Sequence, residues 1–141
     1  LGGEFSGEAT LAADRAWGGP FPQAPGLYVV VMARVIPRLY GESDILYIGQ
    51  AGKLVVRGGT SYQASLRQRW RDYWQGTTQT ERDLRDTLIR LMHDGDVVVV
   101  VFTTEAATPE ALARREAELL DRFFADHREL PPLNRAKPTL R

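Results

Sequence analysis

Runs of apolar residues divide the chain into six predicted elements, separated by glycine, proline and polar turns. Residues 27–36 and 45–50 are rich in valine, isoleucine and tyrosine, which is typical of β-strands. A cluster of glycine, serine and acidic residues lies between them, so we expect the two strands to pair antiparallel. Residues 97–102 are apolar without alternation, which predicts a third strand covered on both faces.

Three other segments carry apolar residues at helical spacing. The predicted helices are 61–75, with Thr60 and Gln63 as a capping box; 81–93, capped by Thr80; and 109–127, capped by Thr108 with Pro109 at its first position. Of the three tryptophans on the chain, we expect Trp17, Trp70 and Trp74 to belong to the core rather than to a base-stacking surface.

The order β-β-α-α-β-α predicts one α+β domain over residues 26–134. Its economical architecture is a small three-stranded sheet, mixed or antiparallel, flanked by helices. Residues 1–25 are expected to be an irregular lead-in with a turn of helix near 11–15. Residues 51–61 are expected to form a loop, and residues 135–141 a frayed tail.

Composition indicates an ordinary globular chain. The 141 residues are 43% hydrophobic and 26% charged, which suits one domain with its own core. The absence of cysteine excludes disulfides, thiolate metal sites and a thiol nucleophile. No apolar run reaches the length of a membrane span and no secretory signal is visible, so we expect a cytoplasmic protein without a membrane partner.

The charge of the chain is zero overall but is unevenly distributed. Residues 26–76 carry a net charge of +4, residues 77–127 of −5 and residues 128–141 of +3. A basic face on a neutral protein can bind phosphate locally. Solvated surface charge explains the same counts, so charge alone does not decide between the two.

One carboxylate stands out on the third predicted helix. On a wheel of about 100° per residue, Glu116 falls in the middle of the apolar stripe, whereas Glu118 falls on the charged side. A carboxylate on a core face is unfavourable unless it is protonated, paired or bound to a metal. A buried ion pair with an arginine and a metal site therefore both stay open for Glu116.

The first predicted helix places Arg69 and Tyr73 on one face, because they are four residues apart. Arg69 also lies three residues after the core position Leu66. Its planar guanidinium would suit a phosphate. The alternative is that Arg69 pairs with an acid on the second or third helix.

The two tyrosine strands have matching ends, Gly26-Leu27-Tyr28 and Tyr47-Ile48-Gly49. This pair resembles the signature of the GIY-YIG nuclease family, with leucine in place of the usual isoleucine. The segments around Arg69 and Tyr73, around Glu116, and Pro132-Leu133-Asn134 resemble the family's further motifs in the same order. The resemblance covers most of residues 26–134, although the connections after Tyr28 and after Gln50 are longer than in most members.

The resemblance implies an endonuclease that hydrolyses DNA phosphodiester bonds with one divalent cation. It implies that Tyr28 is the general base and that Tyr47 holds the water or the phosphate, with the two roles exchangeable. The catalytic residues carried over are Tyr28, Tyr47, Arg69, Tyr73, Glu116 and Asn134, with Glu116 as the ligand of Mg²⁺ or Mn²⁺. Gly49, Gln50, Lys53 and Arg57 are the candidate substrate-binding residues.

Two rival hypotheses remain compatible with the sequence. In one, the same fold binds nucleic acid without cutting it. In the other, the domain serves protein interaction, and Glu116 is simply ion-paired in the core. For a small and nearly neutral nuclease, we also expect affinity for DNA to be supplemented by a homodimer, an additional DNA-binding segment or a partner.

Overall fold

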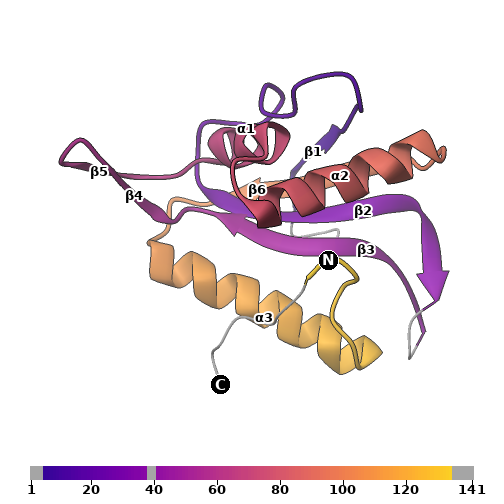
Figure 1. The fold of residues 1–141 in the computed structure, drawn as a ribbon. Coiled ribbons are helices and arrows are strands. Elements are labelled where there is room, and N and C mark those ends of the chain that lie inside the picture. The colour runs from indigo at the N-terminus through magenta and orange to yellow at the C-terminus, as the bar shows by residue number, and fades with distance from the viewer. Residues whose placement is uncertain (1–4, 38–40, 135–141) are drawn as a thin grey trace.

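The chain folds into three layers, with α1 and α2 on one face of a β-sheet and α3 on the other (Figure 1). The computed structural model describes residues 5–37 and 41–134. The strands are β1 (Gly7–Thr10), β2 (Gly26–Pro37), β3 (Glu42–Ala51), β4 (Leu54–Arg57), β5 (Thr60–Gln63) and β6 (Val98–Thr104). The helices are α1 (Leu66–Gln75), α2 (Gln79–His93) and α3 (Pro109–His127).

The main sheet has four strands in the order β1-β6-β2-β3, and every neighbouring pair is antiparallel. The predicted α+β class and the antiparallel pairing of β2 with β3 are confirmed. The predicted three-stranded sheet is wrong by one strand, because β1 lies in the supposedly irregular lead-in. Its sequence, Gly-Glu-Ala-Thr, has no strand signal of its own, so the strand exists through its backbone pairing with β6.

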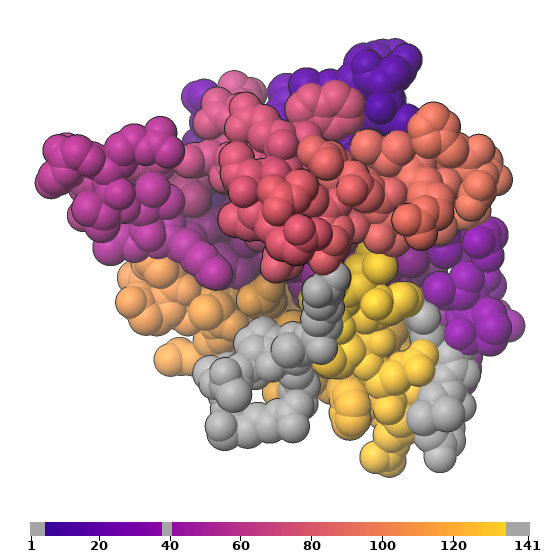
Figure 2. Space-filling model, in the orientation of Figure 1, coloured from indigo at the N-terminus to yellow at the C-terminus, as the bar shows by residue number. Residues whose placement is uncertain are grey.

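The predicted loop 51–61 is in fact largely a two-stranded hairpin, β4–β5. Gly58 and Gly59 form its turn with φ angles of 59° and 79°, the left-handed backbone that a tight hairpin of this twist requires. The hairpin is paired only with itself, and Figure 2 shows it projecting from the body of the molecule. Its strands are too short and its tip is too polar to give the apolar periodicity from which the other strands were predicted.

Two predicted helix starts are also wrong. Helix α1 begins at Leu66 because Ser65 is its N-cap and accepts a hydrogen bond from the Gln68 backbone N–H. Helix α2 begins at Gln79 because Thr78, not Thr80, forms a capping box with Glu81. The start of α3 at Pro109, after its cap at Thr108, is confirmed. Among the described helices, none combines the length and apolar character that crossing a bilayer requires.

The alternation of β2 divides its side chains between two cores. Tyr28 and Val30 point toward α1 and α2, whereas Leu27 and Val29 point toward α3. The first core contains the predicted tryptophans Trp17 and Trp70 as fully buried rings, with Trp74 packed against it. The second is built by Leu27, Val29, Ile48, Leu112, Leu119, Leu120 and Phe123.

Strand β3 is an edge strand of the main sheet, and the segment after α3 pairs with part of its free edge. The Leu133 backbone N–H donates to the Leu46 carbonyl at 2.9 Å. Asn134 continues this pairing with its side chain. Its Oδ1 accepts from the Ile48 N–H, and its Nδ2 donates to the Ile48 carbonyl, both at 2.9 Å. The predicted tail, residues 135–141, lies outside the described residues.

Replacing Asn134 by alanine is expected to release this part of the edge. Two backbone groups of Ile48 lose their partners, which should lower the free energy of unfolding by about 1–3 kcal/mol. Hydrogen exchange at the Ile48 amide should become faster, as measured by NMR. Gln23→Ala, which truncates an exposed amide, is the control and should change neither quantity. Unchanged protection of Ile48 in Asn134→Ala would contradict the pairing.

Candidate functional site

The tyrosines of β2 and β3 lie close together because of the register between the two strands. Tyr28 is directly opposite Gly49, and Tyr47 is opposite Val30, so both tyrosines face the same side of the sheet. The centroids of their rings are 6.2 Å apart. A Cβ at Gly49 would lie 2.6 Å from atoms of the Tyr28 ring, so the glycine makes room for that ring to cross β3.

Tyr73 of α1 completes a cluster of phenols. Its hydroxyl is 2.6 Å from the hydroxyl of Tyr28, and both side chains are almost fully buried. Burial raises the pKa of Tyr28, Tyr47 and Tyr73 above the ordinary value, and the Arg69 charge opposes this rise. On their own, the protein groups therefore keep these phenols protonated.

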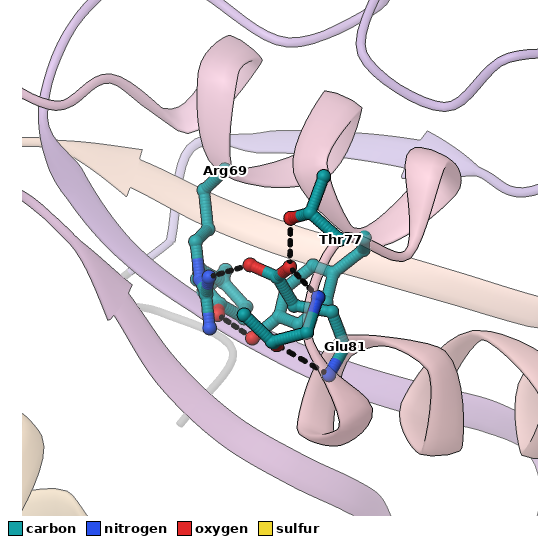
Figure 3. Close-up of polar contacts among 6 residues, drawn as sticks. Arg69, Thr77 and Glu81 are labelled. Atoms are coloured by element: carbon teal, nitrogen blue, oxygen red, sulfur yellow. Dashed lines mark hydrogen bonds and ion pairs between the residues drawn. The ribbon is translucent and has the colours of Figure 1, made fainter.

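Arg69 is held between an aromatic ring and a carboxylate. Its guanidinium carbon lies 4.3 Å from the centroid of the Tyr73 ring, and its Nη1 donates to Glu81 Oε2 at 2.8 Å (Figure 3). Of the two possibilities that the sequence left open, the ion pair with an acid of the second helix is present. It does not use the whole side chain, which remains partly exposed.

Glu81 is the residue of this cluster that sequence reasoning missed. Its Oε1 accepts from the Thr77 hydroxyl at 2.5 Å and from the Thr78 backbone N–H at 3.0 Å (Figure 3). Burial acts to raise the pKa of Glu81, but these hydrogen bonds and the Arg69 charge outweigh it and lower the pKa. The sequence signal for Glu81 is the capping box from Thr78 to Glu81, whereas the predicted cap at Thr80 lies two residues later.

Glu116 reaches the same region from α3, on the opposite side of the sheet from α1. Its side chain is half-buried, whereas Glu118 is exposed, as the helical wheel predicted. Burial raises the pKa of Glu116 from 4.5 to about 7, although the Lys53 and Arg69 charges act to lower it. Within the described residues, the Glu116 carboxylate has no hydrogen bond and no ion pair, so the arginine partner considered from the sequence is not found there.

Two hollows meet at these side chains. A larger one, of about 460 Å³, and a smaller one, of about 230 Å³, are both lined by Tyr47 and Glu116. Tyr28, Arg69 and Lys53 line only the smaller hollow, which we call the basic hollow. Tyr73 and Asn134 line only the larger one, which we call the large hollow. The six predicted catalytic residues thus come from five separate segments to one pair of adjoining hollows.

The candidate substrate-binding residues divide into two groups. Gln50 and Lys53 line the basic hollow, and Gln50 Oε1 is buried there without a hydrogen-bond partner among the described residues. Arg57 lines neither hollow, because it is carried outward on the β4–β5 hairpin. Gly49 supports the Tyr28 ring from β3, as described above, rather than forming a hollow wall.

The donor set for a cation is small. In the part of the chain that the structure describes, no group of three or more histidine, aspartate or glutamate side chains is arranged to hold a metal ion. Among the described residues, the basic hollow offers the carboxylates of Glu116 and Asp72, both without an ion pair or hydrogen bond there, and the unpartnered amide oxygen of Gln50. Oxygen donors of this kind suit a hard cation that keeps most of its water.

Comparison with known proteins gives no relative for this chain. No family model, no curated protein and no solved structure matches it.

Removal of the Glu81 carboxylate is expected to destabilise the fold. Glu81→Ala leaves the Arg69 charge without its partner and breaks the capping box, and should lower the free energy of unfolding by about 2–4 kcal/mol in urea titrations. Thr78→Ala removes the cap and keeps the ion pair, so its loss should be about 1 kcal/mol. Equal losses in the two variants would show that the ion pair contributes nothing.

The raised pKa of Glu116 predicts that the stability of the fold depends on pH. The Glu116 pKa is 4.5 in the unfolded chain and about 7 in the folded chain, so between these two pH values the folded chain holds a proton that the unfolded chain releases. The free energy of unfolding of the native chain therefore falls as the pH rises through this interval. Glu116→Gln lacks this titration. Its stability relative to the native chain should rise by up to about 3 kcal/mol across the interval, measured in EDTA by urea unfolding. The exposed Glu118→Gln is the control, and parallel pH profiles for native chain and Glu116→Gln would refute the assignment.

Proposed function

We propose that this chain is a GIY-YIG-type endonuclease that hydrolyses DNA phosphodiester bonds with a single divalent cation bound at Glu116. The observation that carries the proposal is the half-buried Glu116 carboxylate, which is unpaired among the described residues and shares its two hollows with the phenols of β2, β3 and α1 and the guanidinium of Arg69. An acid without a partner among the described residues, gathered with an arginine and three phenols around two hollows, is costly for stability alone and is typical of a functional site.

The Glu116 site fits a hydrated Mg²⁺ or Mn²⁺. A carboxylate whose pKa is raised by burial gains more from a cation than an exposed one, since the cation restores its ionised form. When bound, such an ion supplies charge neutralisation at the phosphate and at the leaving oxygen. One carboxylate with several waters is an ordinary way for a protein to hold Mg²⁺.

Arg69 is the group that would receive the phosphate in the basic hollow. Glu81 and the Tyr73 ring fix its guanidinium on two sides, so little side-chain freedom is lost when an anion binds. The open part of the fork faces the basic hollow together with Lys53. Fixed donors of this kind stabilise charge that grows on the phosphoryl oxygens during attack.

A tyrosine is the proposed base. It would act as a phenolate, the form that a bound cation and the Arg69 charge would favour. The phenolate would accept a proton from the attacking water as the water oxygen bonds to phosphorus, and the bond to the leaving 3′-oxygen would then break, with the cation neutralising the charge left on that oxygen. Tyr28 takes this role by resemblance, and a hydrogen bond donated by the Tyr73 hydroxyl would stabilise its phenolate. Tyr47, which lines both hollows, would hold the water or the phosphate, and the two tyrosines remain exchangeable.

Asn134 would influence the reaction indirectly, through the backbone of β3. Both polar atoms of its side chain are bound to the Ile48 backbone, the residue between Tyr47 and Gly49. It therefore fixes the segment of β3 that carries Tyr47. In this proposal Asn134 is a positioning residue, and its contribution is the rigidity of the strand under the site.

The test is a nicking assay on supercoiled plasmid with Mg²⁺, Mn²⁺ or EDTA. The native chain is expected to nick DNA only with the cation, and Glu116→Ala should lose at least about a hundredfold in rate. Glu118→Ala, on the exposed side of the same helix, should keep the native rate.

The contrary outcomes are distinct. Nicking that survives in Glu116→Ala would remove Glu116 from the site. Absence of nicking on plasmid and on branched or mismatched duplexes, together with a thermal midpoint that Mn²⁺ leaves unchanged, would refute the endonuclease and leave a binding or interaction domain.

A further inference from the structure

The two hollows that meet at Tyr47 and Glu116 differ in charge. The basic hollow has the cations Lys53 and Arg69 in its wall, together with the carboxylates of Asp72 and Glu116. The large hollow has Asp83 and Glu116 as its charged residues, and no lysine or arginine is among the described residues that line it. Among the described lining residues, a phosphate finds cations only in the basic hollow, and the two carboxylates of the large hollow disfavour it there. The large hollow is therefore suited to an uncharged group.

The walls of the large hollow are suited to a flat ring with polar edges. Leu84, Leu120 and Leu133 give it apolar walls, and Tyr47 and Tyr73 add aromatic surface. The hydroxyls of Thr80 and Thr87, also in its lining, are hydrogen-bonding groups for ring nitrogens and exocyclic groups. Its volume of about 460 Å³ falls within the range of roughly 300–1,000 Å³ that small-molecule sites occupy.

The connection between the hollows identifies the occupant. In a nucleic acid, a phosphate and the neighbouring base are joined through one sugar, so a phosphate in the basic hollow brings a base to the boundary formed by Tyr47 and Glu116. We infer that the large hollow is a binding site for a nucleobase, unstacked from the strand beside the phosphate held by Arg69. This inference rests on the proposed function and adds the class of substrate to it.

The site selects DNA in which that base is not paired. Turning a base out of a paired stack is costly, and the cost is least where the base is mismatched, unpaired or single-stranded. The chain should therefore prefer DNA with an unpaired base next to the phosphate that it binds. Apolar and aromatic walls with a few hydroxyls are the features by which proteins receive such extruded bases.

The experiment compares binding of two short duplexes that are identical except for one position. One is fully paired, and the other has a single base opposite an abasic site; both are measured by fluorescence anisotropy with Ca²⁺ in place of Mg²⁺, under one salt condition. The native chain should bind the duplex with the unpaired base at least about tenfold more tightly.

Two variants fill the large hollow, and a third variant, on another face of the molecule, serves as control. Thr87→Phe places a ring inside the hollow, and Thr80→Phe places one at its exposed rim, where folding is not at risk. In both, the ratio of the two affinities should fall to about one. Ala125→Phe adds the same ring on the exposed face of α3 and should keep the native ratio.

The outcomes separate this inference from the function it rests on. A native ratio near one, in a chain that binds both duplexes and nicks plasmid, overturns the nucleobase site and leaves the endonuclease standing. A native preference that persists in Thr87→Phe and Thr80→Phe also overturns it, because the base then lies elsewhere. A native chain that binds neither duplex and nicks no DNA refutes the proposed function, and the nucleobase site with it.

Discussion

The register between β2 and β3 is the constraint on which the rest of the site depends. Side chains alternate along a strand, so a slip of β3 by one residue against β2 would turn Tyr47 to the α3 face, away from Tyr28, and bring its apolar neighbours to the other face. The register is fixed from both sides of the sheet, because Leu27 and Val29 are locked into the core under α3. Gly49 restricts the register further, because the Tyr28 ring can cross β3 only at a residue without a side chain.

The second constraint is the ion pair between α1 and α2. Glu81 closes the N-terminal end of α2 and at the same time holds Arg69 of α1, so one carboxylate sets both the start of a helix and the direction of a cation. A buried ion pair adds little stability compared with apolar packing, but it restricts the geometry of its partners. The packing of α1 against α2 and the orientation of the Arg69 guanidinium therefore depend on the same carboxylate.

Sequence patterns were informative where a residue's role is local or periodic. The strands of Tyr28 and Tyr47, the cap at Thr108 and the placement of Glu116 on the inner face of α3 follow from alternation, capping and helical spacing. What the patterns missed is set by pairing with distant segments. Strand β1 needs β6, the role of Glu81 needs Arg69, and the side chain of Asn134 needs the backbone of Ile48.

The docking of Leu133 and Asn134 on the edge of β3 has a consequence for how the protein is made. During synthesis the two tyrosine strands emerge long before residues 133 and 134, and until then the outer backbone of Leu46 and Ile48 is open to any passing extended chain. The docking of Leu133 and Asn134 therefore completes the site and covers this exposed strand edge in a single late step. A chain truncated just before this segment would keep the residues of both cores but would still present a template for strand pairing.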